Sequence, residues 1–87
     1  MLGVVIGYQI WHDNSANAEK KPDKVYLCVR EDKHKNWVGD VGSIIQCKKQ
    51  VFDEAGLTPD DVLNKKVIID SNIWNNTTFG NMIRVIE

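Results

Sequence analysis

The chain has 87 residues, 43% of them hydrophobic, and its 11 Lys and Arg nearly balance 12 Asp and Glu for a net charge of −1. This length allows one domain, predicted over residues 1–87, and excludes a doubly wound nucleotide-binding domain, a TIM barrel and a two-domain enzyme. The apolar content is too high and the net charge too low for intrinsic disorder.

β-branched side chains dominate the apolar composition, with nineteen Val or Ile against four Leu and three Ala. Such residues suit a pleated sheet better than a helix. Alternating apolar positions predict three strands in the first half of the chain: Leu2–Trp11, Val25–Arg30 and Ser43–Val51. A polar loop over residues 12–24 and a charged turn over 31–42 separate them.

The alternation within these strands also predicts which side chains share a face of the sheet. In the first strand it places Val4, Ile6, Tyr8 and Ile10 on one face and Val5, Gly7, Gln9 and Trp11 on the other. In the next two strands it groups Tyr26 with Cys28 and Arg30, and Gln46 with Lys48. Because glycine weakens a strand interior, Gly7 predicts a bulge or bend that lets one long strand serve two sides of a barrel.

Helical signals follow the third strand. Gly56 closes a helical turn over residues 52–55, and Thr58 is a good N-cap, with Pro59 at the first helical position. Asp61, three residues after Thr58, completes an acidic capping box, and Asn64 is expected to end the helix in the left-handed conformation. Two further strands are expected, Val67–Ile73 and Asn81–Ile86, joined by a loop over residues 75–78. Short strands without a long helix predict a closed or nearly closed barrel.

Three strands, a short helical turn and two more strands make up the layout of the OB-fold. Three local features fit as well: Gly7 in a long first strand, the stretch Thr58–Val67 ahead of the fourth strand, and Phe79-Gly80 ahead of the last. In size and layout the chain resembles the small single-stranded-DNA-binding proteins of filamentous phages (the gene V type) and related mobile elements. SH3-like and other small β-barrels share much of this layout.

The resemblance implies an all-β fold, a five-stranded OB-like Greek-key barrel with one short helical turn between strands three and four. It also implies sequence-nonspecific binding of single-stranded DNA, a role in DNA replication in a small genetic element, and a homodimer. The residues themselves do not separate DNA from RNA as the ligand.

Charge is unevenly distributed along the chain. Residues 20–49 carry eight basic groups against four acidic groups, a net charge of +4, whereas residues 50–87 carry a net charge of −3 and residues 1–19 a net charge of −2. Phosphates attract such a basic stretch, and aromatic rings beside it would stack on bases. The predicted phosphate contacts are Lys20, Lys21, Lys24, Arg30, Lys33, Lys35, Lys48 and Lys49, and the predicted stacking residues are Tyr26, Trp37, Trp74 and Phe79.

Other interpretations of the same residues stay open. The charges could form an ordinary solvated surface and the Trp side chains could fill the barrel. A small β-barrel that binds protein, as an adaptor or inhibitor, would use the acidic second half, namely Asp53, Glu54, Asp60 and Asp61.

The spacing of His12, Cys28, His34 and Cys47 matches no zinc pattern. We therefore expect no metal, no cofactor and no catalytic residue.

The two cysteines are too few for a disulfide framework, so buried, reduced thiols are expected. The apolar start of the chain lacks the basic region of a signal peptide, and His12-Asp13-Asn14 interrupts the approach to a cleavage site. No apolar run approaches the length of a membrane-spanning helix. These features predict an intracellular, cytoplasmic protein.

Overall fold

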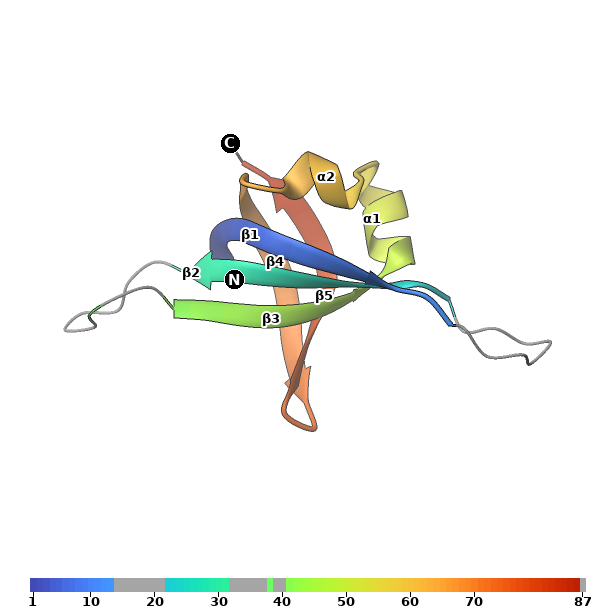
Figure 1. Ribbon diagram of the computed structural model, residues 1–87, viewed down its shortest axis with the longest axis horizontal. Helices are drawn as coiled ribbons and strands as arrows, with labels where there is room; N and C mark the ends of the chain where they lie inside the picture. The colour runs from blue at the N-terminus through green and yellow to red at the C-terminus, as the bar shows by residue number, and fades with distance from the viewer. Residues whose placement is uncertain (14–21, 32–37, 39–40, 87) are drawn as a thin grey trace.

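Figure 1 shows the computed structural model, which describes residues 1–13, 22–31, 38 and 41–86. Within these residues the chain forms five strands and two short helices. In chain order they are β1 (Leu2–Trp11), β2 (Lys24–Glu31), β3 (Val41–Lys48), α1 (Lys49–Ala55), α2 (Pro59–Val62), β4 (Lys66–Trp74) and β5 (Thr77–Val85).

The strands close into a barrel in the order β1-β2-β3-β5-β4. β1 runs antiparallel to both β2 and β4, and β3 meets β5 in a short parallel pairing. In Figure 1, β1, β2 and β3 form one layer that β4 and β5 cross, with both helices at one end of the barrel. The predicted all-β, five-stranded OB-like barrel with a helical segment between strands three and four is therefore confirmed.

Alternate strand positions fill the barrel interior. In β2, Val25 is 3% exposed and Leu27 and Val29 are fully buried, as the alternation predicts. The core formed by the described residues draws on every strand and both helices: Val5, Val25, Leu27, Val29, Ile45, Cys47, Phe52, Val62, Val67, Ile69 and Ile83. Because these side chains all point inward, the opposite positions of each strand face outward and are available for binding.

A bulge in β1 confirms the bend expected at Gly7 and corrects the predicted faces of this strand. The register with β2 shifts between Val5 and Gly7, so Ile6 is an extra residue. Val5 is fully buried before the bulge and Tyr8 packs against the core after it, whereas the prediction put them on opposite faces. One inserted residue exchanges the inward and outward positions that follow it, which a strict alternation cannot foresee.

Helix α1 replaces the last residues of the predicted third strand, which was expected to run to Val51. The chain leaves β3 after Lys48 and enters helix α1. A side-chain pair four residues apart supports this helix, because Gln50 Nε2 donates to Glu54 Oε1 at 2.9 Å. Phe52 is 2% exposed at the end of the barrel. Burial of the Phe52 ring stabilises the protein more than continuing the strand to Val51 would.

The predicted capping box opens α2. The hydroxyl oxygen of Thr58 accepts from the Asp61 backbone N–H at 3.3 Å, and Asp61 Oδ2 accepts from the Thr58 N–H at 2.8 Å. Asn64 takes the expected left-handed conformation, with φ of 62°. Like the rest of the described helical structure, α2 is too short and too polar to cross a membrane.

The β4–β5 hairpin is longer than predicted. Asn75 and Asn76 alone make the turn, both at positive φ, and Thr77 and Thr78, expected in the loop, already belong to β5. Asparagine tolerates this conformation well, so two residues suffice to reverse the chain. The hairpin therefore protrudes beyond the barrel, as Figure 1 shows.

We expect two glycines of β1 to differ sharply in their tolerance of alanine. At Gly3 a β carbon would lie 2.6 Å from the Arg30 carbonyl oxygen and 2.7 Å from Val29 Cγ1, so Gly3→Ala should lower the free energy of unfolding by about 2 kcal/mol. At Gly7 a β carbon meets nothing within 4 Å, so Gly7→Ala should leave that free energy unchanged or raise it by about 0.5 kcal/mol.

Urea unfolding followed by circular dichroism measures both variants against the parent chain. Equal stabilities of the two variants would contradict the close approach of β1 and β2 at Gly3.

Candidate functional site

Outward-facing side chains form two rows of register partners across the strands. The first, which we name the basic row, joins Trp11, Lys24 and Lys48, which are register partners on neighbouring strands. Lys24 Nζ lies 5.0 Å from the centre of the Trp11 ring, a cation–π contact. This contact orients the Lys24 ammonium without neutralising it, so its charge remains available to an anion.

The second row, the aromatic row, extends across all five strands. Its members are successive register partners: Gln9, Tyr26, Gln46, Phe79 and Asn72. The parallel pairing of β3 with β5 makes the row continuous, because it places Phe79 opposite Gln46. Register partners on one face of a sheet are in side-chain contact range, so the row forms one surface.

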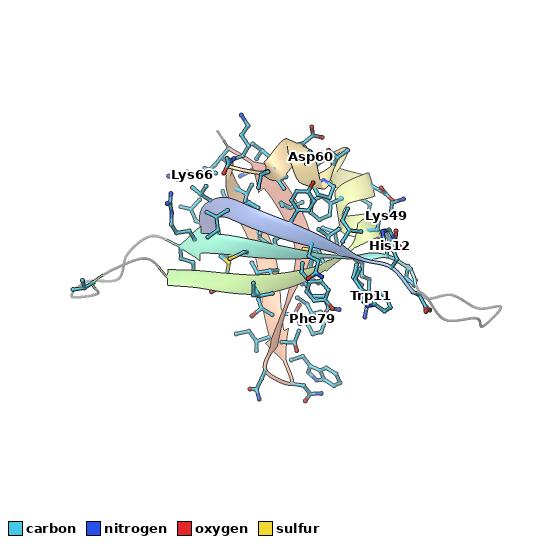
Figure 2. The ribbon with its side chains drawn as sticks, in the orientation of Figure 1. Trp11, His12, Lys49, Asp60, Lys66 and Phe79 are labelled. Carbon is cyan, nitrogen blue, oxygen red and sulfur yellow. The ribbon has the colours of Figure 1, made fainter. Side chains whose placement is uncertain are left out.

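A groove of about 570 Å³ connects the two rows. Its walls come from β2, β3, α1 and the hairpin: Lys24, Gln46, Lys48, Gln50, Val51, Glu54, Asn72, Trp74, Phe79, Gly80 and Asn81. In Figure 2, Phe79 lies toward the β4–β5 hairpin, whereas Asp60 and Lys66 lie at the other side of the barrel. The groove therefore gathers cations, aromatic rings and amides on one side of the molecule.

The two aromatic rings of the groove are neighbours on the hairpin. Trp74 pairs with Thr77, two residues before Phe79, so the rings are diagonal neighbours on one face, with β carbons about 7 Å apart. Trp74 is 67% exposed, whereas Phe79 is half-buried. Phe79 thus supplies a fixed ring and Trp74 a ring open to solvent.

The structure brings together five of the residues predicted to bind nucleic acid. Lys24, Lys48, Trp74 and Phe79 line the groove, and Tyr26 lies between Gln9 and Gln46 in the aromatic row. The predicted contacts Lys20, Lys21, Lys33, Lys35 and Trp37 lie outside the described residues.

Two other predicted contacts are placed apart from the groove. Arg30 is exposed on the same face of β2, but six residues from Lys24 and paired with Val4 and Gly42. Lys49 belongs to α1, where its Nζ lies 3.9 Å from Asp53 Oδ2. Helix α1 begins at Lys49, so this lysine leaves the sheet face that Lys48 still occupies.

The amides of the groove were not predicted. Gln46, Asn72 and Asn81 line it, and Asn81 Nδ2 donates to Asn72 Oδ1 at 2.7 Å. The signal that could have identified them is spacing, because each lies two positions from a predicted contact on the same strand face. Gln46 precedes Lys48 in this way, and Asn72 precedes Trp74.

A second hollow, of about 410 Å³, adjoins the aromatic row at Tyr26. It is lined by Gly7, Tyr8, Gln9, Tyr26, Cys28 and Ile44. Ile44 is 60% exposed. The hollow extends the candidate surface toward Arg30 and gives it an apolar end.

The cysteines are both free, and they occupy opposite sides of the sheet. Cys47 is fully buried as predicted, and burial raises the pKa of its thiol to about 11, although a hydrogen bond with the Gly80 backbone acts in the opposite direction. Cys28 is half-buried and faces outward, so the expectation of a buried thiol is wrong there. Cys28 lines the second hollow beside Ile44, its register partner on β3.

A close polar contact links the ends of β1 and β2 beside the basic row. His12 Nδ1 lies 3.0 Å from Asp23 Oδ2, and the Asp23 carbonyl accepts from the Lys49 N–H at 3.1 Å. His12 thus has a structural partner, and His34 lies outside the described residues. No group of three His, Cys, Asp or Glu side chains that could hold a metal occurs among the described residues.

The acidic side chains of the two helices each have a partner within the chain. Asp53 pairs with Lys49 and Glu54 accepts from Gln50. Asp60 accepts a hydrogen bond from the Tyr8 hydroxyl, which raises the pKa of Tyr8, and Asp61 is occupied in the capping box. Of these four carboxylates, Glu54 alone lines the groove.

We expect the two thiols to react at very different rates. In the native protein at pH 8, a disulfide reagent such as DTNB should modify Cys28 within minutes, whereas Cys47 should react only after unfolding. Cys47 combines complete burial with a pKa of about 11, which keeps it protonated. Counting the released thiolate at 412 nm, as is usual for this reagent, tests the expectation. Rapid native reaction of a Cys28→Ser variant would contradict it.

Comparison with known proteins finds no relative of the chain, because no protein-family model, no curated protein and no solved structure matches it. The similarity to gene V-type proteins therefore stays a prediction from the layout of the sequence, and the site is defined by its own residues.

Proposed function

We propose that the protein binds single-stranded nucleic acid without sequence specificity, in the groove and along the two rows of outward-facing side chains. The observation that carries this proposal is the meeting of Lys24 and Lys48 with Trp74 and Phe79 in one groove. Cations for phosphates and exposed rings for bases are the two components that nonspecific single-strand binding requires.

The lysines supply the electrostatic part of binding. Lys24 and Lys48 are register partners, so two ammonium groups face the same stretch of backbone. Each phosphate they neutralise releases condensed counterions, which favours binding at low salt. Glu54, which also lines the groove, reduces the local charge and would repel the phosphates from its own position.

The aromatic rings supply the part of binding that salt does not screen. Stacking of a base on a protein ring contributes about 1–3 kcal/mol and tolerates any base, because every base has a π face. Phe79, held in the aromatic row, and the exposed Trp74 are the stacking residues of the groove. Tyr26 would continue the path of the strand toward the second hollow.

The wider setting rests on the resemblance alone. It points to single-stranded DNA, to replication of a phage or mobile element, and to a homodimer. The groove itself fits RNA as well, since its cations and rings address features that both polymers share.

Binding to a basic protein partner through the acidic helices is the second candidate. It is favoured by the exposure of Asp53, Glu54, Asp60 and Asp61. However, each of these carboxylates already has a hydrogen-bond or ion-pair partner within the chain. The groove residues offer a more complete set of interactions, so we favour nucleic acid.

We expect oligo(dT) to quench the tryptophan fluorescence of the protein, with an affinity that falls as salt is raised. Phe79→Ala should weaken binding roughly tenfold through the loss of stacking. Lys24→Gln or Lys48→Gln should each lower the slope of log K against log salt concentration by about 0.7. Lys65→Gln is the matched control, because Lys65 is exposed and lies outside the groove.

Absence of quenching below about 0.1 M salt, where screening is incomplete, would contradict the proposal. So would an equal loss of affinity in the Lys65→Gln and Lys48→Gln variants. Parallel titrations with oligo(U) measure the preference between DNA and RNA.

A further inference from the structure

Asn81 lines the groove beside an irregularity in the β4–β5 ladder. Asp70 pairs with Met82 and Ser71 pairs with Gly80, so Asn81 is an extra residue that has no partner in the ladder of β4. Gly80, just before it, is buried against the core. Asn81 lies two residues after Phe79, so the alternation of β5 places it on the groove face, where its amide meets that of Asn72.

The hydrogen bond between the two amides leaves a donor and an acceptor side by side. Asn81 Nδ2 donates to Asn72 Oδ1 at 2.7 Å, so Asn81 Oδ1 and the Nδ2 hydrogens of Asn72 remain available. Both residues are exposed, and an exposed hydrogen bond of this kind contributes little to folding stability. The pair adjoins Phe79, which is the register partner of Asn72.

Every nucleobase has a hydrogen-bond donor next to an acceptor on the edge that it uses for Watson–Crick pairing. In thymine these groups are N3–H and O4. Two asparagine amides can present donor and acceptor in either order, because both can rotate by half a turn and keep their mutual hydrogen bond. Such a pair would accept any base, provided that the edge of the base is unoccupied.

We propose that the Asn72–Asn81 pair binds the Watson–Crick edge of an unpaired base that stacks on Phe79 or Trp74. This inference rests on the proposed function and adds the recognition of the base edge to it. In a duplex that edge is already hydrogen-bonded to the opposite strand. The amide pair therefore selects single strands over double strands without reading the sequence.

The experiment compares oligo(dT) with an oligomer of N3-methylthymidine of the same length. The methyl group removes the N3–H donor and blocks the edge, but it keeps the phosphates and the face of the ring. The parent protein should bind oligo(dT) about three- to tenfold more tightly, the range expected for one or two exposed hydrogen bonds. The Asn72→Ala/Asn81→Ala double variant should bind both oligomers equally.

Two further variants separate edge recognition from stacking and from general loss of an amide. Phe79→Ala should weaken binding of both oligomers. Asn76→Gly removes an amide from the hairpin turn, where glycine suits the positive φ, and should keep the discrimination of the parent protein. Thermal unfolding of each variant confirms that the barrel is intact.

Equal binding of both oligomers by the parent protein would overturn the inference and leave the proposed function standing. Discrimination that survives in the double variant would overturn it too. Failure of both oligomers to bind at low salt would instead overturn the proposed function, and the inference with it.

Discussion

The short parallel pairing between β3 and β5 is the interaction on which the rest of the structure depends. It closes the barrel at three register positions, and it requires glycine at residue 80, where a β carbon would lie 2.6 Å from Cys47 Sγ. The same pairing places Phe79 beside Gln46 and so joins the hairpin to the sheet of β1, β2 and β3. Without it, Trp74 and the asparagines of the hairpin would have no lysines to share a groove with.

The sequence predicted those elements whose signals are local. The apolar alternation of β2 and β3 and the capping box of α2 depend on neighbouring residues, and the structure confirms them. Local signals in the sequence did not predict the features that depend on closure of the barrel. The extra residue at Ile6 exchanges the faces of β1, and helix α1 takes over from the strand because Phe52 fills the barrel end. Both result from long-range packing that overrides local propensity.

The residues of the candidate site also divide into those that local signals predict and those that depend on the closed barrel. The distribution of charge along the sequence identified Lys24 and Lys48. It does not indicate that the next residue, Lys49, leaves the sheet with α1 and pairs with Asp53. The rings of the hairpin were identified by their residue type. The amides were missed because the prediction considered cations and aromatic rings alone, and because the meeting of Asn81 with Asn72 depends on the register of β4 with β5.

A net charge of −1 does not conflict with binding to a polyanion, because the acidic and the basic side chains have different partners within the chain. The carboxylates of α1 and α2 have partners within the chain. Within the described residues, the contact of the Lys24 ammonium is with the neutral ring of Trp11. Screening at physiological salt limits each exposed charge to about 8 Å, so a phosphate in the groove senses mainly the nearest lysines. With two lysines and two rings at the groove, stacking and base-edge hydrogen bonds would supply much of the affinity. Such binding would weaken with salt less steeply than binding to a wholly basic surface.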